Sequence, residues 1–223
     1  FYPVPSFNVP MGVMIPKQKD VEDLIVAEKS VSVSNLINGA TRLQPVVMQL
    51  GQAAGALAAT ACKDGRSVRR VGVRQVQRVL LEAGCYIMPY LDLPKEHRHF
   101  KALQRIGATG LLRGEGRNVG WANQTWFRAG DPLVAEDLFV KDFYNGPVGL
   151  TEGEVSVGQL LGIMKGLGAP IPASSPETWW ESLGLEDYDQ SRTVTRLEAA
   201  VVIDATVDLF SMFNVDYEGN LRR

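Results

Sequence analysis

Hydrophobic positions in the first 34 residues fall into short runs rather than into a helical repeat. The runs are bounded by proline at residues 2–5 and 13–15, continuous at residues 24–27, and of period two at residues 31–34. Short apolar runs and alternation with period two are typical of β-strands. Residues 1–34 are therefore expected to form a short sheet that is partly buried on both faces.

Residues 45–62 form the most apolar stretch and are rich in glycine and alanine. Pro45 suits the first turn of a helix, and Gly65 lies just beyond its expected end. Gly51, Gly55 and Ala59 recur every four residues, so one smooth helical face would let another backbone or a ligand approach closely. The glutamines in this stretch and its marginal length favour such a helix over a membrane span.

Helical periodicity continues through the rest of the chain. A second helix is predicted over residues 73–83, where Gly84 ends it. From about Pro94, short helices alternate with loops rich in glycine, tryptophan and asparagine. Further helix starts are expected at Asp131–Pro132 and at two capping boxes, Ser156 to Gln159 and Thr195 to Glu198.

A shift of about 61 residues superimposes apolar positions of two segments. It brings Phe100 onto Leu161, Leu103 onto Met164 and Ile106 onto Leu167. Two copies of a helix–loop–helix unit would give this pattern, and so would two amphipathic helices that share apolar positions by chance. The expected fold class is α+β, predominantly α. A short sheet and two helices are expected over residues 1–92, and a helical region of two helix–loop–helix units over residues 93–223.

Composition narrows the function classes. The 223 residues are 45% hydrophobic and 22% charged, as in an ordinary globular protein. Lys and Arg number 23 against 25 Asp and Glu, and no dense basic block occurs, which disfavours nucleic-acid binding. Because the chain begins at Phe1 without a leader pattern, we expect a processed or excised piece of a longer protein.

Residues that could bind metals or act as nucleophiles are sparse. Cys62 and Cys85 are too few for a disulfide scaffold and are not a close-spaced pair. His97 and His99 would point about 200° apart on a helix, so no metal site is expected. The sequence contains no Gly-x-Ser-x-Gly elbow and no phosphate-binding loop.

Residues 38–45 are the one segment that points to a ligand. They include Gly39 and Arg42 and lead into the helix that starts near Pro45. A glycine-containing loop at a helix N-terminus offers backbone N–H groups and the positive end of the helix dipole, and Arg42 adds a guanidinium. This arrangement suits an anion. The alternative is a tight connection in which Arg42 pairs with a carboxylate.

Three segments in order, residues 22–34, 38–45 and 51–55, resemble the C-terminal flavin-binding segment of a family of FAD-dependent oxidoreductases. In that family a strand ends in a turn of the Ala-Glu-Lys type, and a loop then enters a Gly-Gln-Ala-Ala-Gly helix whose start faces the flavin. The resemblance covers about residues 1–80. It implies that the chain contributes to an FAD site.

The resemblance also implies roles for individual residues. Glu28 would lie near the ribityl or pyrophosphate portion of FAD, and the Arg42 loop near the isoalloxazine edge, where a helix N-terminus stabilises negative charge on the reduced ring. Gly51 would allow close packing. The expected cofactor-binding residues are Glu28, Gly39, Arg42, Leu43, Gln44 and Gly51.

FAD enzymes of this type hold the adenosine diphosphate on an N-terminal Gly-x-Gly-x-x-Gly turn, and this chain has none. The resemblance therefore implies a C-terminal fragment whose partner is the N-terminal FAD-binding portion of the same protein. Alone, the fragment is expected to bind FAD weakly or not at all and to be inactive.

The remainder is similar to an S-layer homology module, on residues 100–114, 127–133 and 194–200. Arg196 would be the signature arginine, which in such modules helps to bind anionic cell-wall polysaccharide, whereas residues 134–137 lack it. These helices are expected to cap the flavoprotein. Trp121, Trp126, Trp179 and Trp180 would either stack on sugars or close a small core.

Three hypotheses of function result. The first is the C-terminal part of a secreted or envelope-associated FAD-dependent oxidoreductase. The second is a non-catalytic carbohydrate or cell-wall binding module. The third is part of a polysaccharide-degrading, xanthan lyase-like protein, although no Tyr/His/Asn lyase site is visible in the sequence.

Overall fold

The computed structural model describes residues 7–17, 21–140, 143, 152–172 and 174–222. Over these residues the chain is mostly helical with two small antiparallel sheets, which confirms the α+β, predominantly α class. The α-helices are α1 (Asn35–Thr41), α2 (Gln44–Asp64), α3 (Val73–Glu82), α4 (Phe100–Thr109), α5 (Val157–Gly166), α6 (Pro176–Ser182), α7 (Arg196–Val207) and α8 (Leu209–Met212). The paired strands are β1 (Glu115–Val119) with β2 (Ala122–Trp126), and β3 (Asn214–Val215) with β4 (Leu221–Arg222). The 3-10 helices are η1 (Met11–Met14), η2 (Glu28–Ser30), η3 (Val68–Arg70) and η4 (Ala135–Asp137).

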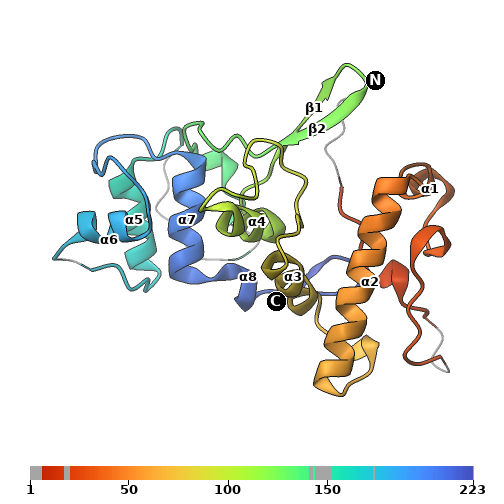
Figure 1. Ribbon diagram of the computed structural model, residues 1–223. Coiled ribbons are helices and arrows are strands. Elements are labelled where there is room, and N and C mark those ends of the chain that lie inside the picture. The colour runs from red at the N-terminus through yellow and green to blue at the C-terminus, as the bar shows by residue number, and fades with distance from the viewer. Residues whose placement is uncertain (1–6, 18–20, 141–142, 144–151, 173, 223) are drawn as a thin grey trace. The chain divides into compact units, whose positions relative to one another are not determined.

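Two compact units divide the chain (Figure 1). The first, called the α2 unit, comprises residues 7–87 and 213–222, and the second, called the hub unit, comprises residues 88–212. The chain therefore leaves the α2 unit at residue 87 and re-enters it at residue 213. The packing units do not show which function each part of the chain has. The predicted flavin-binding portion, residues 1–92, and the predicted S-layer-homology-like region, residues 93–223, therefore stay predictions.

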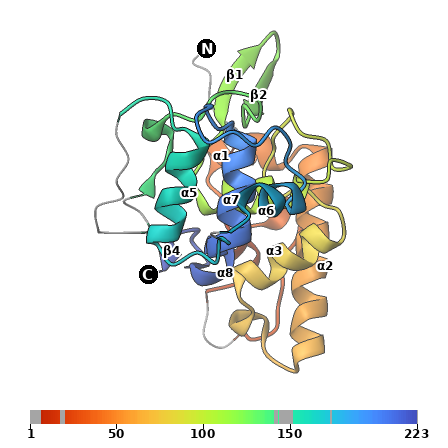
Figure 2. The ribbon, with the colours of Figure 1, turned by 90° about the vertical axis from the view of Figure 1, so that its left-hand side faces the viewer.

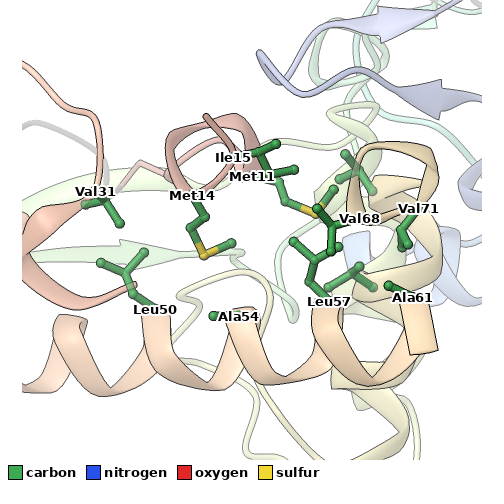
Figure 3. Packing of buried hydrophobic residues seen from close by; sticks show 12 residues of the cluster. Met11, Met14, Ile15, Val31, Leu50, Ala54, Leu57, Ala61, Val68 and Val71 are labelled. Carbon is green, nitrogen blue, oxygen red and sulfur yellow. The ribbon is translucent and has the colours of Figure 1, made fainter. Parts of the chain in front are cut away.

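The core of the α2 unit lies along one face of α2. Leu50, Ala54, Leu57 and Ala61 recur at helical spacing and are buried, and Leu57 is fully enclosed. They pack against residues of η1, η3 and the segments beside them: Met11, Met14, Ile15, Val31, Val68 and Val71 (Figure 3). The glycine- and alanine-rich helix is thus half of a hydrophobic core, with its leucines Leu50 and Leu57 on the inner face.

The ends of α2 and α3 confirm the sequence prediction. α2 starts at Gln44 with Pro45 in its first turn, and it ends before Gly65, whose φ of 59° is the left-handed conformation that glycine adopts without strain. α3 ends at Glu82, two residues before Gly84, which has a φ of 74°. These boundaries depend on local residues, so they can be read from the sequence.

The expected N-terminal sheet is wrong for the described residues. Residues 11–14 form η1, and residues 24–27 and 31–34 are extended without being strands. Only single backbone hydrogen bonds join them, from Val26 N–H to Met14 O at 2.8 Å and from Ser32 N–H to Val13 O at 2.9 Å. A strand needs a repeated ladder. Here the apolar side chains of these segments pack on the α2 core instead. The segment 2–5 lies outside the described residues.

Three short extended segments form the centre of the hub unit. Leu133, Val155 and Val194 lie in their middles, and all three are buried. Leu133 N–H donates to Val194 O at 2.8 Å, Val155 N–H to Leu133 O at 2.9 Å, and Val194 N–H to Val155 O at 2.9 Å. This closed ring is called the hub. The segments that the 61-residue shift superimposes, residues 100–106 and 161–167, lie in and beside α4 and α5 instead.

Each hub segment leads into a helical turn. Both predicted capping boxes are confirmed: Ser156 and Gln159 exchange hydrogen bonds at the start of α5, as do Thr195 and Glu198 at the start of α7. The hub segments of Val155 and Val194 share a sequence signal. In each, an apolar residue is followed by Ser or Thr, and Gln or Glu follows three residues after that.

The helix expected after Asp131–Pro132 is wrong. The segment there joins the hub and then forms only the short η4. The Asp131 carboxylate accepts a hydrogen bond from Arg128 Nε at 2.7 Å and caps no helix. The residues after Asp131 are instead extended and paired in the hub, where Leu133 N–H donates to Val194 O at 2.8 Å, so no helix starts directly after Asp131.

α7 packs against α4 and α5 within the hub unit, and it lies beside α5 in both views (Figures 1 and 2). Asp204 of α7 is buried and forms an ion pair with Arg105 of α4. The second carboxylate oxygen of Asp204 and the Nε of Arg105 have no hydrogen-bond partner among the described residues. Burial raises the pKa of the Asp204 carboxyl to about 6, while Arg105 acts in the opposite direction.

This pKa predicts how stability changes with pH. A carboxyl whose pKa is higher in the folded protein than in the unfolded chain stabilises the fold at low pH, and that contribution disappears as pH rises from about 4 to about 6. The contribution of Asp204 to the free energy of unfolding should fall by up to about 3 kcal/mol over this range, and Asp204→Asn should abolish the fall. Chemical denaturation of wild type and variant from about pH 3.5 to about pH 7 measures the difference.

Glu181→Gln is the matched control, because it neutralises an exposed carboxyl on α6 of the same unit. Its stability curve should run parallel to that of the wild type. If the Asp204→Asn curve is parallel as well, the ionisation of Asp204 is not coupled to folding.

Candidate functional site

The turn between α1 and α2 is short. Ser34 starts α1, because its hydroxyl accepts a hydrogen bond from the Ile37 backbone N–H at 3.3 Å. α1 extends to Thr41, so only Arg42 and Leu43 connect it to α2. The expected loop over residues 38–45 is therefore mostly helical, and Gly39 lies inside α1. The Ser34 cap was the signal for this helix in the sequence.

The backbone N–H groups of the turn are partly used. Those of Arg42 and Leu43 donate to carbonyl oxygens of α1 at 3.1 and 3.2 Å. The backbone N–H groups in the first turn of α2 have no side-chain cap, because the N-cap residue Leu43 provides no side-chain hydrogen bond. Pro45 in this turn has no N–H. The donors left for a ligand at this helix end are the N–H groups of Gln44 and Val46.

Arg42 adds a positive charge beside these donors. Its side chain is exposed, and no ion pair joins it to a carboxylate of the described residues. The alternative in which Arg42 pairs with a carboxylate is thus absent from the part of the chain that the structure describes. Arg42 lies two residues before the start of α2, so a cationic residue and the positive end of the α2 dipole occur in one short turn, and helix N-termini of this kind bind anions in other proteins.

The outer face of α2 is exposed and uncharged. No charged residue occurs from Gln44 to Cys62. Met48 is 75% exposed, and a Cβ atom added to Gly51 or Gly55 would meet nothing within 4 Å. Leu36 of α1, which the sequence did not indicate, is 87% exposed. The outer side of a surface helix normally carries charged and polar residues. This face carries no charge, and the exposed Gln52 lies on it beside Met48, Gly51 and Gly55, so it is partly polar and partly apolar.

Glu28 lies in η2, which packs against α2. Its φ of 59° is left-handed, a conformation in which a non-glycine residue costs of order 1 kcal/mol. Its exposed carboxylate accepts a hydrogen bond from Ser30 Oγ at 3.1 Å. Glu28 and the Arg42 turn therefore belong to elements that pack on the same helix.

All six residues predicted to bind the cofactor are exposed in the α2 unit. The structure brings five of them together on α1, the turn and the first half of α2: Gly39, Arg42, Leu43, Gln44 and Gly51. An open surface with free donors and a cation can accommodate the electron-rich edge of a flavin, so these residues fit such a group.

Arg196 in the hub unit is closed to ligands. It is 2% exposed, and its Nε donates to Phe127 O at 2.9 Å while one Nη donates to Arg113 O at 2.7 Å. Its other Nη pairs with the Asp137 carboxylate. Every nitrogen of the guanidinium thus has a partner inside the fold. The anion-binding role that the S-layer resemblance implies for Arg196 is not supported by this geometry.

The four tryptophans of the hub unit differ in exposure. Trp180 is fully buried and donates from Nε1 to Glu186 O at 2.9 Å. Trp126 and Trp179 are half-buried. Trp121 is fully exposed at the tip of the β1–β2 hairpin, which projects from the helices of this unit (Figures 1 and 2). Only Trp121 offers a whole ring to a partner.

His97 and His99 lie in a turn before α4, with ring centroids 5.4 Å apart, so the expected divergence on a helix is wrong. His99 is buried, and its ring contacts Gly184 O at 3.2 Å. In the described ranges, no three His, Cys, Asp or Glu side chains are grouped so that they could hold a metal ion. Each helix of those ranges also falls short of the length and apolar character that a membrane crossing requires.

The open space beside Gly51 gives a testable prediction. Gly51→Ala should raise the free energy of unfolding of this chain by roughly 0.5–1 kcal/mol, because alanine favours a helix interior and its Cβ meets nothing here. Ala59→Gly, on the same exposed face, should lower it by a similar amount. Thermal or chemical denaturation measures both, and a destabilising Gly51→Ala would show that the position is covered in the isolated chain.

Comparison with known proteins gives one family match. Residues 1–80 match the model of a family described as FAD dependent oxidoreductase. No curated protein and no solved structure matches the chain. The matched residues include η2, α1, the Arg42 turn and α2, whereas the S-layer resemblance of the later residues has no counterpart in these comparisons. Residues 1–80 are thus similar to part of an FAD-dependent oxidoreductase domain.

Proposed function

We propose that this chain is the C-terminal part of an FAD-dependent oxidoreductase, in which the start of α2 faces the flavin. The observation that carries the proposal is the exposed Arg42 beside the uncapped first turn of α2. The family match over residues 1–80 supports it. Its partner is the N-terminal FAD-binding portion of the same protein, which would provide the adenosine diphosphate site.

The electrostatics of the turn suit a group that gains negative charge. A bound flavin would accept and donate electrons, and its reduced ring carries negative charge near N1 and the adjacent carbonyl. The N–H groups of Gln44 and Val46 are held in place by the backbone of α2, and Arg42, two residues before Gln44, adds a positive charge in the turn. Such preorganised donors stabilise developing charge without reorganisation. Leu43 would give the ring edge an apolar neighbour.

The uncharged outer face of α2 has a separate role in this proposal. Gly51 and Gly55 leave room for a close approach, and Met48 provides an apolar contact. We assign this face to packing against the FAD-binding portion, and Glu28 to the ribityl or pyrophosphate side of the cofactor. The isolated chain then has half of the site, so it should bind FAD weakly or not at all and be inactive.

Arg42→Gln in the full-length protein tests the flavin contact. Loss of one charge-assisted interaction should weaken FAD retention about tenfold and lower the two-electron reduction potential of bound flavin by about 30 mV, because the reduced anion loses more stabilisation than the oxidised ring. Equilibrium dialysis and a spectroscopic redox titration measure the two effects.

Arg66→Gln is the control, since Arg66 is an exposed arginine of the same unit beyond the other end of α2. It should change neither quantity. Full-length protein that takes up no stoichiometric yellow flavin from added FAD would reject the proposal altogether.

A second candidate function, carbohydrate or cell-wall binding in a secreted or envelope-associated protein, concerns the hub unit. The observation that favours it is Trp121, whose exposed ring lies at a hairpin tip near the amide pair of Asn118 and Asn123, joined at 2.9 Å. A flat aromatic ring flanked by amide groups suits a sugar, with its apolar face and hydroxyl rim. A xanthan lyase-like activity would add cleavage to this binding, and no residue is assigned to it.

Trp121→Ala should weaken retention on insoluble cell-wall polysaccharide about tenfold, as expected for loss of one stacking ring. Val119→Ala, at the same tip, should have no effect. Arg196→Gln should lower stability instead, because it removes a buried ion pair. Equal retention of wild type and Trp121→Ala in a pull-down would eliminate this candidate.

A further inference from the structure

The α2 unit is completed by the last residues of the chain. We infer that the β3–β4 hairpin is a clasp that holds η3 and η1 onto α2, so that the stability of α2 and its turn depends on residues 213–222. The inference rests on contacts within the α2 unit. It does not depend on the proposed flavin function, and it would hold whatever ligand the turn binds.

Tyr217 is the central contact of the clasp. Its hydroxyl lies within hydrogen-bond distance of three carbonyl oxygens in and beside η3: Val68 at 3.3 Å, Arg69 at 2.5 Å and Val71 at 3.0 Å. The three carbonyl groups lie at and beside the end of a 3-10 helix, where Val68 O also accepts from the Val71 N–H at 3.3 Å, and the single hydroxyl proton of Tyr217 is shared among them. The ring of Tyr217 packs against the α2 core.

The backbone of Tyr217 holds a second element. Gly12 N–H of η1 donates to Tyr217 O at 2.9 Å. A Cβ atom on Gly12 would lie 2.6 Å from that oxygen, which is closer than real Cβ contacts. The glycine at position 12 is therefore required by the hairpin. Tyr217 contacts both η1 and η3, and residues of these elements pack on the inner face of α2.

Local hydrogen bonds stabilise the turn of the hairpin. The Asp216 carboxylate accepts hydrogen bonds from the N–H groups of Glu218 at 3.0 Å and Asn220 at 2.8 Å, so the tight turn is fixed locally. Val215 pairs with Leu221 and packs against the same core. At the entry to the hairpin, buried Arg74 of α3 donates from Nε to Phe213 O at 3.2 Å.

The two parts of the α2 unit are far apart in the sequence. Residues 7–87 form most of its core, residues 213–222 cover the rest, and the residues of the hub unit, 88–212, lie between them in the sequence. Docking of the hairpin closes a loop of more than a hundred residues, whose entropy opposes the contact. Releasing the hairpin would expose Val68 and Val71 and loosen the α2 core, while the hub unit keeps its own core.

Hydrogen exchange on the full chain tests this inference. Tyr217→Phe keeps the ring and removes the hydroxyl, and it should speed exchange of the amides near Leu57 and Ala61 in α2 about threefold to tenfold. Gly12→Ala should give at least the same increase, because it forces the Tyr217 carbonyl away. Amides of α4 and α7 in the hub unit should exchange at their wild-type rates in both variants.

Two controls match these variants. Glu218→Gln changes an exposed residue at the tip of the same hairpin, and Gly72→Ala adds a methyl group where nothing lies within 4 Å. Both should leave exchange in α2 within twofold of the wild type. If Tyr217→Phe and Gly12→Ala stay within that range as well, or if α4 and α7 accelerate equally, the clasp is refuted. FAD plays no part in the measurement, so failure of the flavin proposal would leave this result unaffected.

Discussion

Burial of one face of α2 is the contact on which the α2 unit depends. Leu50, Ala54, Leu57 and Ala61 provide a long hydrophobic surface, and η1, η3 and the extended segments pack onto it. This burial leaves the opposite face exposed with Met48, Gln52, Gly55 and Ala59 and without charge. One face of the helix therefore forms the core, and different residues on its other face form the candidate binding surface.

Two arginines show how burial decides the use of a charge. Arg196 is enclosed, and its guanidinium is satisfied by two carbonyl oxygens and the Asp137 carboxylate. A buried charge needs such partners, and once it has them it is a structural group. Arg42 is exposed at a helix start, with no ion pair among the described residues. A sequence motif pointed to both arginines, and only their surroundings separate the structural residue from the candidate ligand contact.

The two units differ in how their cores are closed. Three backbone hydrogen bonds join the hub segments in a ring, so a backbone N–H of each segment donates to a carbonyl oxygen of another segment. The α2 unit has no such ring and is closed by a hairpin from the end of the chain. The hairpin adds hydrogen bonds to the carbonyl groups of Val68, Arg69 and Val71 and to the N–H of Gly12, so its docking satisfies backbone groups of η1 and η3. The region similar to FAD-dependent oxidoreductases is thus linked to residues far outside the matched range.

The sequence alone determined what depends on neighbouring residues. Pro45 and Gly65 marked α2, the Ser156 and Thr195 boxes marked α5 and α7, and Arg42 with Gly51 marked the candidate surface, because caps, left-handed glycines and helical faces are local. Tertiary structure decided the rest. The described residues 11–17 and 21–34 have the pattern of strands but form no ladder, the segment after Asp131 joins the hub instead of starting a helix, and Tyr217 reaches η3 from about 150 positions away. Each of these outcomes depends on contacts with groups that are distant in the sequence, and no local pattern encodes them.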